Sequence, residues 1–289
     1  MFLLAEGSTH HHTPLIVEFL NYYFGEPVYK FQIAYIKPLW DKYVFSHFGT
    51  SAEKVFGPYT PENAIPWYTV MFVIACILTV VTIWILRGKL SEDDPSHGQL
   101  TLEAAFLALQ DLVKDVIGEH GLKYFPVVAT FACLILVSNL MGLFPLFMAP
   151  TASINVTLAL GITSFIYYNY IGIKENGLIA HLGHLAGPIW WIAPLIFLIE
   201  LFSNLIRPFT LGVRLFANMY ADEQIASIIS GLFPPFTQIL VPVVLLVLAV
   251  FIAVVQTLVF TLLSMIYISE VSHPSHDDEH AHGEHMATT

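Results

Sequence analysis

The side chains best suited to chemistry are ionisable residues inside one long apolar stretch, residues 189–230. They are Glu200, Arg207, Arg214, Asp222 and Glu223. A stretch of this length and composition is typical of a membrane segment, where a charge costs several kcal/mol unless it is paired or hydrated. Each of these side chains is therefore a candidate for a functional site.

Helical geometry separates these candidates into two groups. Thr210, Arg214 and Asn218 are spaced by four residues and share one face of a helix, and Arg207 lies within about 20° of Arg214. Glu223 follows Arg214 by nine residues, a rotation of about 180°. One helix thus places cationic and amide groups on one face and an acid on the opposite face.

The arginine and the carboxylates also differ in their proton chemistry. The guanidinium of Arg214 cannot lose its proton in a protein, so it can attract an acid without relaying a proton. Carboxylates such as Glu200 and Glu223 can load and release protons near neutral pH when burial raises their pKa. This pattern predicts an electrostatic gate flanked by proton carriers. Gln256, near the middle of the last apolar run, is placed to meet the arginine stripe.

Two interpretations remain open for Arg207. It either forms a static ion pair with Glu200, two helical turns earlier, or takes part in the functional site. Arg214 has no carboxylate three or four residues away in either direction. Its partner is therefore expected on another helix or another chain.

The amino-acid composition shows which classes of protein this chain can belong to. The chain has 289 residues, of which 56% are hydrophobic and 11% charged, against roughly 25% charged in a soluble domain. This excludes an ordinary soluble enzyme. The net charge of −11 argues against nucleic-acid binding, which needs a basic face. Cys76 and Cys133 lie singly in apolar runs, as packing residues do.

The apolar runs predict an all-α membrane protein with about five membrane helices and one interfacial amphipathic helix. The predicted divisions are an N-terminal peripheral or interfacial segment 1–65, a first membrane helix 66–86, a cytoplasmic loop 87–124 with the amphipathic helix at 102–117, a membrane hairpin 125–172 with spans at 125–147 and 152–172, a loop 173–188, a helix pair 189–269 and a His- and acid-rich tail 270–289.

The last two apolar runs are too long for upright spans. A continuous helix over 189–230 would measure about 60 Å, twice the hydrocarbon core, so it must tilt steeply or break. Pro194 and Pro208 are the positions where it would bend, with neighbouring helices satisfying the freed backbone groups. The run 239–269 is also overlong. Together they predict a tilted antiparallel hairpin that forms an ion pathway.

The distribution of basic residues predicts the orientation. Arg87, Lys89, Lys114 and Lys123 follow the first span, and Lys174 lies on the same side two spans later. The positive-inside rule then places residues 87–124 and the C-terminus in the cytoplasm and the N-terminus outside. Since no organellar targeting segment is recognised, we expect a bacterial plasma membrane.

The residues around Arg214 resemble the signature of a known family. The run IFLIE ending at Glu200, followed by RPFTLGVRLFANMYADE over 207–223, is similar to the a subunit of the F-type ATP synthase membrane sector. Further blocks occur in the family's order, at 139–143, 150–158 and 255–268. The resemblance spans about residues 66–270, and several ordered blocks are more specific than one short motif.

This resemblance implies a stator beside a rotating ring of c subunits. Arg214 would face the ring's essential carboxylate, with Asn218 and Gln256 in support. Glu200 and Glu223 would line two aqueous half-channels. Peripheral-stalk b subunits and, through the stalk, the soluble catalytic sector would be the other partners, with membrane lipid around the chain. No independent active site and no cofactor are expected.

The sequence departs from some relatives at two positions. Where some members of the family carry an ionisable residue about two turns before the glutamine, this chain has Ala249. The acidic neighbour Asp222 is a candidate to compensate, so the sequence leaves more than one route for the entry half-channel. The second departure is Ala217 in place of glycine, a small change for helix approach.

Two other classes of function stand as alternatives. A histidine-ligated membrane metalloenzyme is suggested by thirteen histidines. The pair His181 and His184 has plausible ligand spacing, but it lies in the predicted loop 173–188 without a nearby acid or cysteine. A self-contained ion carrier is the other. Carriers commonly show internal repeats, and none relates 66–172 to 189–269.

Overall fold

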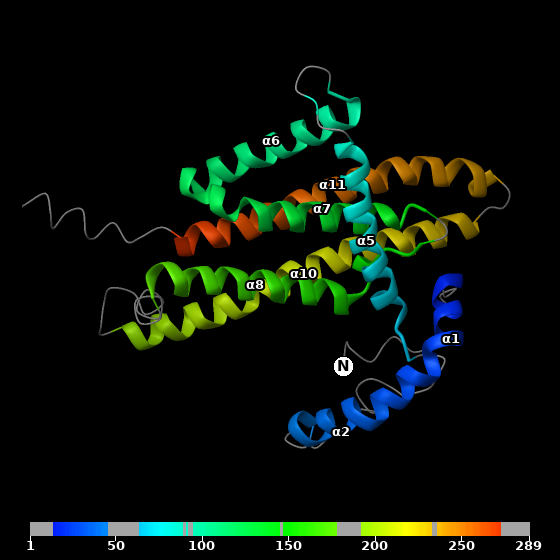
Figure 1. The fold of residues 1–289 in the computed structure, drawn as a ribbon, viewed down its shortest axis with the longest axis horizontal. Coiled ribbons are helices and arrows are strands. Elements are labelled where there is room, and N and C mark those ends of the chain that lie inside the picture. Colours follow the sequence, from blue (N-terminus) through cyan, green and yellow to red (C-terminus); the bar gives the residue numbers. More distant parts are fainter. Residues whose placement is uncertain are drawn as a thin grey trace, which may run out of the picture.

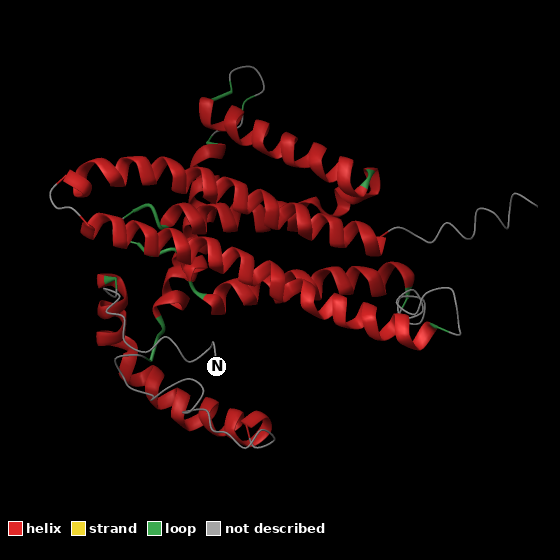
Figure 2. Ribbon diagram, turned by 180° about the vertical axis from the view of Figure 1, so that it is seen from behind, coloured by secondary structure: helices red, strands yellow, loops and turns green. Residues whose placement is uncertain are grey.

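In the computed structural model, residues 14–45, 64–88, 91, 95–144, 147–177, 192–232 and 236–272 are described, and this part of the chain contains helices and loops but no strand (Figure 2). Five of its helices are long and apolar enough to span a membrane: Trp67–Arg87, Glu119–Met141, Ile154–Asn176, Pro194–Ile225 and Leu246–Ser272. The predicted all-α membrane fold is therefore confirmed.

The first membrane helix is followed by the amphipathic one. Helix α5 (Trp67–Arg87) begins after Pro66 and ends at Gly88, whose φ of 52° suits glycine. Helix α6 (His97–Ile117) is capped at its N-terminus by Ser96, whose hydroxyl accepts a hydrogen bond from the backbone N–H of Gln99. In both views α5 crosses the other membrane helices (Figures 1 and 2).

Two shorter membrane helices follow. A 3-10 turn η5 (Glu119–Tyr124) leads into α7 (Phe125–Met141), and a second turn η6 (Pro150–Ala152) precedes α8 (Ile154–Asn176). Helix α7 ends six residues before the predicted limit at 147, because at Gly142 the backbone changes to turn hydrogen bonds such as Leu143 N–H to Leu140 O.

The last two helices are the longest. Helix α10 (Ala193–Leu232) has 40 residues and α11 (Phe236–Ser272) has 37. They pack against each other and run in opposite directions (Figure 1). Their lengths correspond to about 60 and 55 Å, so neither can stand upright in a hydrocarbon core of about 30 Å.

Helix α10 continues through Pro208, which the sequence left as a possible break. Proline has no N–H, so the carbonyl of Asn204, four residues earlier, loses its helical partner. The hydroxyl of Tyr168 on α8 lies 3.4 Å from this carbonyl oxygen and also donates to the Asn204 side chain. The one proton of this hydroxyl is shared between the side chain and the carbonyl of Asn204, so a neighbouring helix supplies the donor near the group that the proline leaves free.

Helices α8 and α10 touch through two glycines. A Cβ built on Gly161 would lie 2.5 Å from the Pro208 carbonyl oxygen, and one built on Gly212 would lie 2.8 Å from the Thr157 carbonyl oxygen. Both contacts involve backbone atoms, so only glycine permits this approach. The segment of α10 between Arg207 and Arg214 is thereby held directly against α8.

The N-terminal segment is helical over residues 15–45. It consists of α1 (Leu15–Phe31), η2 (Gln32–Ile36), α2 (Lys37–Trp40) and η3 (Asp41–Phe45). Asn21 anchors it by accepting from the backbone N–H of Ile65 at 3.0 Å and donating to its carbonyl at 3.1 Å. The peripheral or interfacial location of residues 1–65 stays a prediction.

Candidate functional site

Arg214 lies on an exposed face of α10. The neighbours that share its face, Thr210 and Asn218, are also exposed, whereas Leu211 and Leu215 are buried in the core. The predicted stripe is therefore one continuous face. Arg214 forms no hydrogen bond or ion pair with any residue that the structure describes.

Exposed apolar side chains lie on both long helices. They include Ile206, Phe209, Val213 and Tyr220 on α10, and Phe251, Val254, Val255 and Leu258 on α11. This surface would be covered in a membrane by lipid or by another protein. A fixed cation in an apolar surface is costly unless an opposite charge meets it.

Asn218 connects the arginine face to the last helix. Its amide nitrogen donates to Gln256 Oε1 on α11 at 2.6 Å. Gln256 is 3% exposed, and its own Nε2 has no hydrogen-bond partner among the described residues. The structure thus brings together Asn218 and Gln256, as their positions in the sequence suggested. A buried donor without a partner marks a place where a water or another polar group fits.

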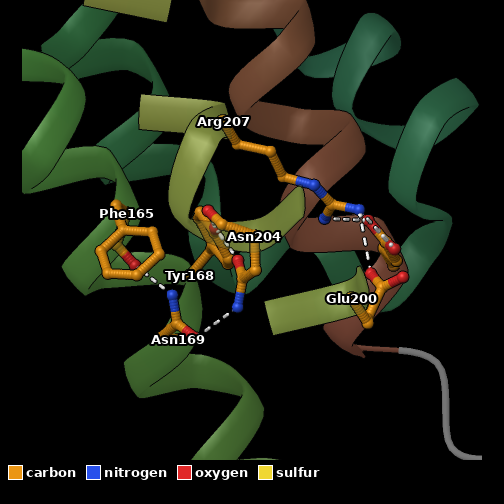
Figure 3. A network of polar contacts seen from close by, with 7 residues as sticks. Phe165, Tyr168, Asn169, Glu200, Asn204 and Arg207 are labelled. Atoms are coloured by element: carbon orange, nitrogen blue, oxygen red, sulfur yellow. Dashed lines mark hydrogen bonds and ion pairs between the residues drawn. The ribbon is translucent and has the colours of Figure 1, made fainter. Parts of the chain in front are cut away.

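Arg207 is held in an ion-pair network, in contrast to Arg214. Its Nη2 lies 3.0 Å from Glu270 Oε1 and 3.4 Å from Glu200 Oε1, and its Nη1 contacts the second oxygen of Glu270 (Figure 3). The guanidinium also lies 5.1 Å from the centre of the Tyr267 ring. The ion pair with Glu200 at two turns' spacing is confirmed.

A second polar network lies beside the first. Asn204 on α10 accepts from Tyr168 and donates to Asn169 Oδ1 at 3.4 Å, and both partners belong to α8. Figure 3 shows these three side chains next to Arg207 and Glu200. Tyr168 and Asn204 are buried, so this network places hydrogen-bonding groups between helices that are otherwise apolar.

The two acids after Arg214 are both half-buried. One oxygen of Asp222 is buried without a hydrogen-bond partner among the described residues. Glu223, by contrast, has an interaction partner in the structure. Ala249 on α11 is half-buried and carries no ionisable group. A buried carboxylate oxygen lacking a donor is suited to hold a proton or meet water.

Metal ligands do not gather in the part of the chain that the structure describes. No group of three or more His, Cys, Asp or Glu side chains there could hold a metal ion. The pair His181 and His184 and the tail from 273 onward lie outside the described residues. The two cysteines are free and half-buried.

Sequence reasoning missed four hydrogen-bonding or ion-pairing residues of these networks, Glu270, Tyr168, Asn169 and Asn204. Glu270 was assigned to the tail, although α11 extends to Ser272; the apolar spacing of Tyr267, Ile268 and Val271 was the available signal. Tyr168 and Asn204 carried no signal in the sequence beyond being polar groups inside membrane helices.

The chain is similar in sequence to known proteins. The family model described as ATP synthase A chain matches residues 68–269. ATP synthase subunit a of Geobacter sulfurreducens is 39% identical over 196 residues, which is 68% of this chain and 82% of that protein. ATP synthase subunit a 1 of Syntrophotalea carbinolica is 37% identical over 237 residues, 81% of this chain and 97% of that protein. The family match begins at the second residue of α5 and ends three residues before the end of α11. The chain belongs to the ATP synthase A chain family.

Proposed function

We propose that this chain is the proton-translocating subunit of the membrane sector of a bacterial ATP synthase, and that Arg214 is a gate facing a ring of c subunits. Membership of the family supports the first part of this proposal, that the chain is a subunit of the ATP synthase membrane sector. One observation carries the gate: Arg214 is an exposed cation without a partner among the described residues, on a helix that also exposes several large apolar side chains. Its counter-charge belongs to another chain.

The ring's essential carboxylate is the counter-charge that fits. Opposite a fixed guanidinium, such a carboxylate is held ionised, so its proton leaves toward the outlet half-channel. Past Arg214 the carboxylate takes a proton from the inlet half-channel before it meets lipid, where the ionised form is costly. Because Arg214 repels cations and cannot release its own proton, it also blocks a direct leak between the two channels.

The half-channels are assigned from the polar groups on either side of Arg214. Arg207 and Glu200 lie about two and four turns toward the start of α10, and Asp222 and Glu223 lie about two turns toward its end. Asn218 and Gln256 lie between the arginine and the second group. With no ionisable residue at Ala249, Asp222 is the acid that we assign to the route beside Glu223.

The complete assembly follows from the same proposal. The peripheral-stalk b subunits hold this chain as a stator, and the stalk connects it to the soluble catalytic sector, so the chain needs no active site of its own. Each proton that crosses releases about 2.3 kcal/mol per 100 mV, which drives rotation of the ring. With residues 87–124 and the C-terminus in the cytoplasm, the N-terminus faces outside.

A disulfide crosslink tests the proposed face. Val213, 43% exposed beside Arg214, is changed to cysteine in the assembled complex, and single cysteines are placed along the outer helix of the ring subunit. Oxidation is expected to link the two chains. Val80→Cys on α5, at 68% exposure, is the matched control and should form no such link. Absence of any Val213 crosslink, or equal linking at Val80, would overturn the proposal.

A further inference from the structure

The structure describes two polar contacts that join α10 and α11, and Arg214 lies between them. The first is the hydrogen bond from Asn218 to Gln256, and the second is the ion pair between Arg207 and Glu270. Along α10 the two contacts are eleven residues apart, and along α11 fourteen, or about 16 and 21 Å. Arg214 is thus bracketed by fixed points on both sides.

The ion pair between Arg207 and Glu270 is bidentate, which restricts both the distance and the relative orientation of the two side chains. Both terminal nitrogens of Arg207 contact the two carboxylate oxygens of Glu270, which is the bidentate arrangement that a planar guanidinium favours. The Arg207 side chain is only 19% exposed, and that of Glu270 is 45% exposed. The Tyr267 ring, one turn before Glu270, lies against the guanidinium and limits its rotation.

The packing between the two contacts does not fix the register in this way. Leu211 and Leu215 of α10 and Phe260 of α11 belong to one buried apolar cluster. Apolar contact depends on area and shape rather than on direction, so a sliding of one helix by a turn could find a similar packing. Such a slide would move Arg214 by about 5.4 Å along the helix axis.

We infer that Glu270 is a positioning residue, whose bidentate pair with Arg207 sets the register of α10 against α11 and so the depth at which Arg214 faces the ring. This inference rests on the proposed function. Glu270 acts through Arg207 and through the helix, and touches neither the ring nor the translocated proton.

The test measures depth directly in the assembled complex. In a Val213→Cys background, the yield of disulfide with each of a series of cysteines along the ring's outer helix gives a profile with one maximum. Glu270→Gln is expected to broaden this profile or move its maximum by at least one position, and to lower ATP-driven proton pumping about fivefold. Arg207→Gln should do the same, and the double variant should be no worse than the single ones, because the pair is already lost.

Glu175→Gln is the matched control. It removes a carboxylate of similar exposure, 34%, from an ion pair with Lys123 that joins η5 to α8 and not α10 to α11. Its crosslinking profile should match that of the parent. An unchanged profile in Glu270→Gln, or an equal shift in Glu175→Gln, would overturn the positioning role and leave the gate proposal standing. Failure of Val213→Cys to crosslink in the parent would instead contradict the proposed function.

Discussion

Replacing Gly161 by alanine is expected to push α8 away from α10 and to impair proton pumping. The added Cβ would lie 2.5 Å from the carbonyl oxygen of Pro208, whereas ordinary contact begins at 3.4 Å. The obstacle is backbone, so no side-chain rotation relieves it. The helices must separate by about 0.9 Å at this point.

The expected cost follows from two opposing effects. Overpacking of a close contact costs about 1–3 kcal/mol, while alanine is favoured over glycine in a helix by about 1 kcal/mol. The net loss of stability is therefore at most about 2 kcal/mol. Because Pro208 lies less than two turns from Arg214, the displacement reaches the arginine, and misplacement by about 1 Å can cost a large factor in rate. We expect pumping to fall at least about fivefold.

The assay compares initial rates of ATP-driven acidification in membrane vesicles with the melting temperature of the purified complex. Ala159→Val adds carbon atoms to the exposed side of the same helix, half a turn earlier, and is expected to change neither quantity. Normal pumping and melting in Gly161→Ala would refute the reasoning that backbone contact at this crossing positions Arg214.

Three further predictions concern the polar networks. Asn218→Leu leaves both ends of the buried Gln256 amide without a described partner, so the complex should lose about 1–3 kcal/mol of stability and most of its pumping; unchanged melting would count against the contact. Tyr168→Phe removes the donor that serves the Asn204 carbonyl freed by Pro208 and should cost about 1–3 kcal/mol, while Tyr170→Phe on the exposed side of α8 should be neutral; equal melting of the two variants would contradict this. Lys30 holds the pKa of Glu26 below its ordinary value through a hydrogen bond across a fully exposed pair, so Glu26→Gln should leave the melting temperature unchanged; a loss at neutral pH that vanishes on acidification would show that the pair does stabilise the fold.

Helical periodicity was sufficient to predict the arginine face. Thr210, Arg214 and Asn218 recur every four residues, and the structure places all three on one exposed face. The length of the last two apolar runs likewise predicted an antiparallel pair, and Gln256 lies in α11 where it meets Asn218. These features depend on spacing within one helix, which a sequence displays directly.

Contacts between helices were not predictable in the same way. Whether α10 would break at Pro208 depended on a donor from Tyr168, forty residues earlier in the chain and on another helix. The second acid of Arg207 is Glu270, 63 residues away. The helix over residues 15–45 was also missed, because its aromatic and basic residues show no clean apolar periodicity.

The central claim is that Arg214 both holds the ring carboxylate ionised and blocks a proton leak. Arg214→Ala tests it when ATP-driven pumping and passive proton conductance are measured together in membrane vesicles, the latter after removal of the catalytic sector. The account predicts that pumping falls to background while passive conductance rises above that of the parent. Normal pumping with unchanged conductance would contradict it.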